Sequence, residues 1–539
     1  MTTAAAPASS AAAKSTTVVL LTLAAGQFLM TLDTSVMNVS IATVADDVNT
    51  TVTGIQGAIT AYTLVMASLM IVGAKIGAII GRKRAFAIGC VIYGCGSFTT
   101  SIAPNLYVLL FGWSFLEGVG AALILPAIVA LVAGNFPVAR RPAAYGMVAA
   151  AGAIAVAVGP LIGGVFTTYF SWRWVFAGEV LIVIAILILT RRIADAPPET
   201  KPKLDFVGAV LSASGLALLV FGVLRSSEWG WIKPKAGATS WWGLSPTIWL
   251  VLGGFVVLYA FLQWAAWREK HGKEPLVRPA MLRNKQLRGG LTMFFFQYLA
   301  QAGLFFVVPL YLSVALGLSA LATGARLTPL SITLLAAAIG IPKLRPDANP
   351  RRVVRLGLIA LLLGTVVLMG ALDTDSGPEI VLLPMLLIGL GVGALASQLG
   401  AVTVSAVPDD QAPEVGGIQN TATNLGASMG TALAGALLIA ATTGAFLTNI
   451  QSSDAIPNRV KEEANVKLAG GVQFISDADL ESALKDAHVS PRVTDDTVAA
   501  YQGARITGLK AGLAILALMT ILALVFSRAI PTTQPKEEP

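Results

Sequence analysis

The chain has 539 residues, of which 55% are hydrophobic and only 12% are charged. Soluble proteins average about 45–50% apolar and about 25% charged residues, so this composition excludes a soluble enzyme or a string of soluble domains. The formal net charge of +8 does not indicate nucleic acid, because Lys and Arg collect in the cytoplasmic loops of membrane proteins.

Apolar runs long enough to cross about 30 Å of hydrocarbon follow one another along the chain. We expect the first of them to be a membrane helix, because it is too long for a signal peptide. Six spans are predicted at 17–40, 54–74, 84–103, 106–133, 144–168 and 173–190, two at 206–225 and 247–266, and six at 289–312, 319–342, 353–372, 379–404, 416–445 and 505–530. The predicted fold is therefore an all-α integral membrane protein with fourteen spans.

This plan divides the chain into two six-helix bundles. The N-terminal bundle is predicted at 17–190 and the C-terminal bundle at 289–445 and 505–530, joined by a linker, 191–288, that contains the two extra helices. Connections such as 82–84, 191–203 and 268–288 are rich in Lys and Arg, whereas 41–53 and 373–379 contain none. The positive-inside rule then predicts a plasma-membrane protein with cytoplasmic tails at 1–16 and 531–539. It makes 446–504 an extracellular, partly helical loop.

Asp33 interrupts the first apolar run. A carboxylate at bilayer depth costs about 2.5–3.5 kcal/mol on insertion scales, and such residues usually mark ion or substrate pathways. The functional interpretation is a proton acceptor or a counter-ion for a cationic cargo. The alternative is a carboxylate near the helix end that is solvated from outside.

Glu117 lies about a third of the way into the fourth span, and the same cost applies to it. If both acids face one cavity, they can share a proton. The alternative is a carboxylate that bonds to a neighbouring helix or lies near the lipid interface.

Polar residues at helical spacing predict a path for a small-molecule substrate. In the first span Thr31 belongs to such a stripe, and in the ninth span two glutamines four residues apart are expected to point inward. The predicted substrate-binding residues are Gln27, Thr34, Asn38, Gln297, Gln301, Phe305, Asn420 and Asn424.

Small residues predict close helix packing. Gly152, Gly159 and Gly163 share one face of the fifth span, as in small-xxx-small contacts, and Pro160 favours a kink. Gly426 and Gly430 repeat the pattern in the thirteenth span. Lys75, Glu179 and Arg326 lie near the ends of spans and are expected to have structural roles. Cys90 and Cys95 are not spaced like metal ligands, and both are expected to be small core residues.

Four segments together resemble the major facilitator superfamily, in its fourteen-helix drug:proton antiporter branch. LDTSVMNVSIATV at 32–44 is similar to the helix-1 motif, GPLIGG at 159–164 to the antiporter motif, and SWRWVF at 171–176 and GGIQNTATNLGASMGTALAGALL at 416–438 are also family-like. The resemblance covers roughly 17–530. It implies two bundles that expose a central cavity alternately to each side, with Asp33 in proton coupling and gating or packing roles for Gly73, Gly77, Gly81, Arg82, Gly159, Pro160, Gly163 and Gly164.

Four positions depart from the family pattern. Ala78 stands where the family has an aspartate, and Ile79 where it usually has an arginine. Ser114 stands where the family has an arginine associated with proton coupling, and Glu117 where it has a glutamine.

The leading hypothesis is export of amphipathic compounds by proton antiport, with protons, a small-molecule cargo and membrane lipids as partners. The alternative is a translocase for lipids or lipid-like metabolites with atypical or no coupling. A membrane enzyme is disfavoured because the two histidines, His271 and His488, fall in loops on opposite sides. A receptor or scaffold would predict that Asp33→Asn leaves activity intact. No cofactor, metal site or nucleic-acid partner is expected, and a monomer is assumed.

Overall fold

The computed structural model describes residues 10–136, 141–195, 203–235, 238–407, 412–452, 472–486 and 489–533, and within these ranges the chain is helical. In these ranges, Trp241 and Leu244 form an isolated antiparallel β-bridge outside any strand. The all-α prediction is confirmed.

The N-terminal half holds six long helical segments. Side-chain caps begin several of them: Thr51 accepts a hydrogen bond from the Gly54 amide, and Asn105 from the Val108 amide, which satisfies donors that lack a partner within the helix. The elements are α1 (Ser10–Val39), the short α2 (Ile41–Asp47), α3 (Val52–Ile80), α4 (Arg82–Ser101), α5 (Leu106–Leu109) continued by a π-helix (Leu110–Glu117) and α6 (Gly118–Asn135), α7 (Arg141–Tyr169) and α8 (Arg173–Thr190).

Two helices of the linker and six further long helices follow. They are α9 (Phe206–Trp229) and α10 (Pro246–Lys270), then α11 (Lys285–Leu310) with a π-helical end (Tyr311–Ala315), α12 (Ala320–Leu344), α13 (Pro350–Ala371), α14 (Leu382–Val404), α15 (Ala412–Ser452) and α18 (Pro491–Phe526), with the short α17 (Asp477–Asp486) before the last. The long helices follow the predicted order of six, two and six.

Twelve helices in the described ranges are long and apolar enough to cross a membrane, or thirteen if the bent α7 is one span. The remaining long helix, α4, begins with Arg82, Lys83 and Arg84, which lower its mean hydropathy. The count of fourteen spans remains a prediction. The bend in α7 is 41° and lies between Val156 and Val158, beside Pro160, as a proline in a helix favours.

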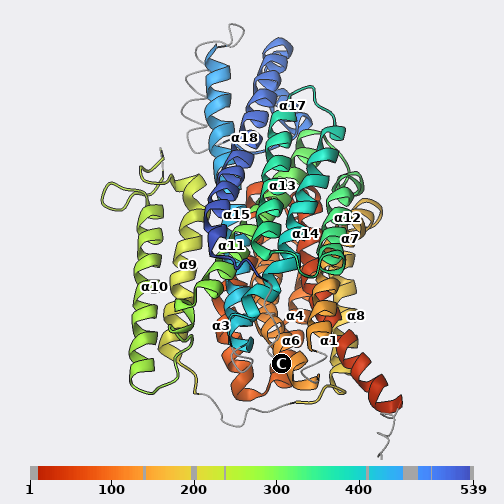
Figure 1. Cartoon of the computed structure of the whole chain (residues 1–539). Helices are drawn as coiled ribbons and strands as arrows, with labels where there is room; N and C mark the ends of the chain where they lie inside the picture. The colour runs from red at the N-terminus through yellow and green to blue at the C-terminus, as the bar shows by residue number, and fades with distance from the viewer. Residues whose placement is uncertain are drawn as a thin grey trace, which may run out of the picture.

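The two sets of six helices meet mainly along two seams, α3 against α15 and α7 against α12. Figure 1 shows α9 and α10 standing together at one side of the bundle, and α17 and the start of α18 at the end opposite the start of α1. Within that arrangement α9 packs on both α3 and α15.

The segment 274–278, between α10 and α11, contacts both bundles. Glu274 forms an ion pair with Lys75 of α3 at 3.1 Å, and the Arg278 amide donates to Glu414 of α15 at 3.1 Å. The buried Asp205 carboxylate, which caps α9, accepts from the Leu276 amide at 3.2 Å in the same segment. The linker therefore fastens the extra helices to both halves.

Two local expectations need correction. The predicted loop 446–504 is shorter, because α15 continues to Ser452 and α18 begins at Pro491. Cys90 is buried as expected, but Cys95 is exposed. Parts of the predicted tails and loop, with His488, lie outside the described residues.

Candidate functional site: a buried carboxylate cluster

Asp33 lies in the middle of the N-terminal bundle, with no exposed surface. The indole Nε1 of Trp113, in the π-helix, donates to both carboxylate oxygens, at 2.7 and 2.9 Å. The Trp113 ring stacks on Tyr62 of α3 with centroids 5.1 Å apart, and the fully buried Tyr62 hydroxyl has no hydrogen-bond partner among the described residues. In the described part of the chain, the hydrogen-bond donor to Asp33 is therefore a neutral indole.

Glu117 is the last residue of the π-helix and is also fully buried. Such wide turns inside helices are often found at functional sites. The Thr100 hydroxyl of α4 donates to Oε1 at 3.2 Å, while Oε2 has no partner in the described part of the chain. The helices approach closely here, since a Cβ on Gly96 of α4 would lie 2.6 Å from the Glu117 Cγ.

Glu179, from the second turn of α8, completes the group. It is 1% exposed, and its Oε2 accepts from Tyr93 at 3.3 Å and Ser97 at 3.2 Å, both on α4. The prediction of a structural charge near a span end missed this position. The available signal was the one used for Glu117, namely a carboxylate several residues inside an apolar helix.

The three carboxylates form one cluster, in which an oxygen from each of Asp33, Glu117 and Glu179 lies within 4.8 Å of the others. None of them pairs with a Lys or Arg of the described ranges. At an effective dielectric constant of 20, two charges at that distance repel by about 3 kcal/mol, so the buried cluster favours sharing protons. The same donors have the geometry to hold a cation, although no metal site is predicted from the sequence.

Among the described residues, none of the predicted substrate residues donates a hydrogen bond to this cluster. Asp33 projects from a different face of α1 than the polar stripe, whose Gln27 faces Gly152 of α7. Gln297 is 3% exposed, and its Oε1 has no partner in the described ranges. The amide of Asn38 donates to the Thr34 carbonyl, and that of Asn424 to the Asn420 carbonyl; Gln301 and Phe305 are partly buried in α11.

The predicted packing residues lie at close helix contacts. A Cβ on Gly73 would lie 2.1 Å from the Ala122 carbonyl oxygen, one on Gly159 2.4 Å from the Ser35 Cβ, and one on Gly164 2.7 Å from the Leu321 Cα. Gly81 has φ +102°, which favours glycine. Of the other residues in this set, Gly77 packs against Ala85 and Gly163 against Val36. The Arg82 guanidinium donates a hydrogen bond to the Ala130 carbonyl. The Pro160 carbonyl lies against Gly324.

Direct hydrogen bonds close the bundles at the end where α3 begins. Gln56 donates to the Thr431 carbonyl at 3.1 Å, and Ser428 to the Thr60 carbonyl at 3.0 Å. On the other seam, Ser331 donates to the Val156 carbonyl at 3.2 Å. We call these contacts the inter-bundle seal.

Two sets of six long helices that meet along hydrogen-bonded seams, with a cluster of acids buried in the N-terminal set, have the architecture of a membrane transporter. The chain belongs to the Major Facilitator Superfamily, whose family model matches residues 23–431. This result confirms the resemblance inferred from the sequence motifs.

Relatives and solved structures agree with this assignment. The chain is 29% identical to the "Probable actinorhodin transporter" of Streptomyces coelicolor over 75% of this chain and 69% of the relative. It is 28% identical to the "Puromycin resistance protein pur8" of Streptomyces alboniger over 81% and 84%. A bacterial homologue of the human lysosomal transporter Spinster, inward-facing and unoccupied, has the same fold, with a TM-score of 0.59 at 14% identity over 96% of this chain and 98% of that one.

Proposed function

We propose that this transporter exports amphipathic small molecules across the plasma membrane by proton antiport. The observation that carries the proposal is the carboxylate cluster of Asp33, Glu117 and Glu179, buried in a transporter fold without a basic partner in the described ranges. Each external proton that binds removes one negative charge from the cluster, and release of a proton on the cytoplasmic side restores that charge.

The cluster links proton occupancy to conformation. In the present conformation Asp33 and Glu117 have no exposed surface, an arrangement that suits a cluster carrying protons, because ionised carboxylates need water or counter-charge. Loss of protons favours a conformation that admits water. A proton moving inward supplies about 2.3 kcal/mol per 100 mV, which supports a gradient of more than tenfold for a neutral cargo.

The names of the relatives support export as the direction and drug-like molecules as the cargo. Besides the two relatives above, the chain is 28% identical to a "Tetracenomycin C resistance and export protein" of Streptomyces glaucescens, over 78% of this chain and 75% of the relative. Ser114 does not supply the arginine that the family uses; its hydroxyl donates to the Ala58 carbonyl at 2.9 Å. In this chain coupling therefore rests on the three acids.

Reconstituted vesicles test the proposal with ethidium and puromycin as probes. An imposed pH gradient is expected to drive both through the wild-type protein, and Asp33→Asn, Glu117→Gln or Glu179→Gln should each abolish the response to the gradient while downhill exchange persists. Asp375→Asn, which removes an exposed acid far from the cluster in sequence, is the control. Efflux that ignores the gradient and survives Asp33→Asn would remove the antiport proposal, and movement of a fluorescent phospholipid under the same conditions would favour the lipid alternative.

A further inference from the structure

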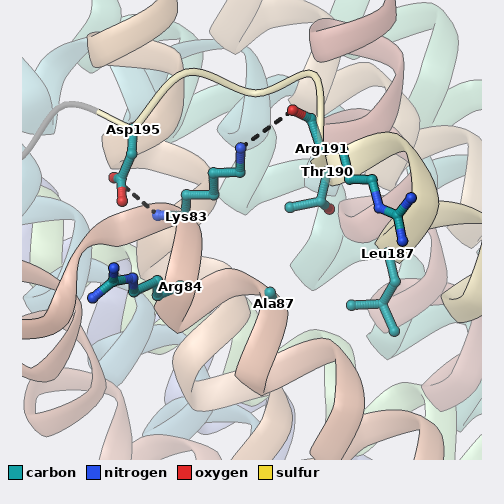
Figure 2. Close-up of a pocket in the computed structure, with 7 residues that line it drawn as sticks. All are labelled: Lys83, Arg84, Ala87, Leu187, Thr190, Arg191 and Asp195. Carbon is teal, nitrogen blue, oxygen red and sulfur yellow. Dashed lines mark hydrogen bonds between the residues drawn. The ribbon is translucent and has the colours of Figure 1, made fainter.

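A basic pocket opens between the start of α4 and the end of α8. It has a volume of about 530 Å³ and is lined by Lys83, Arg84, Ala87, Leu187, Thr190, Arg191 and Asp195. Figure 2 shows Arg84 and Arg191 at opposite sides of this pocket, with Lys83 between them. The pocket lies at the membrane boundary, because both helices end or begin here.

The charges of the pocket are only partly compensated from within. The Lys83 Nζ donates to the Arg191 carbonyl at 3.3 Å, and the Lys83 amide donates to Asp195 at 3.3 Å. Arg84 and Arg191 are exposed, and their guanidinium groups have no hydrogen-bond partner among the described residues. Three cationic side chains against one carboxylate leave a net positive site for an anion.

An apolar groove continues from the basic pocket along the same two helices. It has a volume of about 350 Å³, and Leu187 lines both the pocket and the groove. Gly94 and the buried Val183 meet closely at its floor, since a Cβ on Gly94 would lie 3.0 Å from a Val183 methyl group. Cys95 and Phe98, both exposed, lie along its side.

We propose that the basic pocket and the groove together bind an anionic phospholipid. The phosphate lies between Arg84 and Arg191, and one acyl chain follows the groove between α4 and α8. Basic pockets between membrane helices are suited to such headgroups, and a polar end joined to an apolar trough matches a lipid better than a free phosphate. This site faces away from the bundle interface and does not depend on the cargo or on proton coupling.

The headgroup supplies the selectivity, because lipid tails gain little from leaving one hydrocarbon environment for another. Each Lys or Arg at the surface of an anionic membrane contributes about 1 kcal/mol, or about fivefold in affinity. Arg84→Gln with Arg191→Gln should therefore weaken phosphatidylglycerol binding by roughly 30-fold. Phosphatidylcholine with the same chains should bind weakly to both proteins.

Native mass spectrometry of the purified full chain measures this difference by titration with each lipid. The matched control is Arg192→Gln with Arg345→Gln, which removes the same charge from exposed positions that do not line the pocket. Equal binding of the two lipids by the wild-type protein, or an equal loss in the control, would overturn the proposal.

The groove is tested separately at Cys95, since Cys90 is buried. Phosphatidylglycerol should slow maleimide labelling of Cys95 in detergent, and Arg84→Gln with Arg191→Gln should abolish this protection. Inorganic phosphate and glycerol phosphate should give no protection. The groove would not hold an acyl chain if either soluble anion protected Cys95. The same conclusion would follow if labelling stayed unchanged while phosphatidylglycerol was bound.

Discussion

Gly435 of α15 lies directly against the inter-bundle seal. A Cβ at this position would lie 1.8 Å from the Gln56 Nε2 and 2.2 Å from its Cδ. Gly435→Ala must therefore displace the Gln56 amide, which donates to the Thr431 carbonyl and is 3% exposed. Farther along α15, Gly444 has nothing within 4 Å of its Cβ direction, so Gly444→Ala is a matched control.

The free-energy cost to the closed conformation follows from the lost hydrogen bond between Gln56 and Thr431. Leaving a buried amide without its partner costs about 1–3 kcal/mol. Both substitutions gain about 1 kcal/mol in helix propensity, so that gain cancels in the comparison. Gly435→Ala should raise the ratio of seal-open to seal-closed molecules by about 5- to 150-fold relative to Gly444→Ala.

Electron–electron distance measurements on spin labels report this ratio. Gly57→Cys on α3 and Thr448→Cys on α15 place labels on the two sides of the seam, in a Cys95→Ser background. The longer distance should gain population in Gly435→Ala alone. The reasoning fails if Gly435→Ala keeps the wild-type distribution, or if Gly444→Ala shifts it as much.

Three further predictions concern individual contacts. Asp205→Ala removes the buried ion-pair partner of Arg268 at 3.5 Å and the acceptor of the Trp264 indole at 2.9 Å. It should destabilise the protein by about 3–5 kcal/mol; a small change in detergent unfolding would contradict this. Trp113→Phe keeps an aromatic ring but removes the donor to Asp33, and should slow proton-driven transport at least tenfold in vesicles, so unchanged rates would show that the bond is dispensable. Partial burial, followed by the charges of Asp479 and Asp47, raises the pKa of Asp46 above that of a free aspartate. Stability should therefore fall as pH rises through the raised value, and Asp46→Asn should raise the melting temperature at pH 7 but not near pH 3; a pH-independent effect would refute this sign.

The helices could be predicted because hydropathy and charged connections mark each crossing. Even α4 was predicted, although Arg82, Lys83 and Arg84 lower its hydropathy. The ends of α15 and α18 were not, since helices continue into water with polar residues that hydropathy assigns to a loop. Cys95 shows the same limit within the membrane: an apolar run does not distinguish a side chain facing lipid from one facing the core.

The acids of the site could be found one at a time but not as a group. Asp33 and Glu117 stood out because carboxylates are costly at bilayer depth. Their meeting with Glu179 depends on how α1, the π-helix and α8 pack, which spacing along one helix does not reveal. Trp113, a neutral donor from a π-helix, carries no distinguishing pattern in the sequence.

The position of α9 makes the two seams unequal. Because α9 packs on both α3 and α15, it shields that junction from lipid. The junction of α7 and α12 is closed by direct backbone packing, since a Cβ on Gly324 would lie 2.1 Å from the Pro160 carbonyl oxygen. Any separation of the halves along the first junction must therefore also move α9.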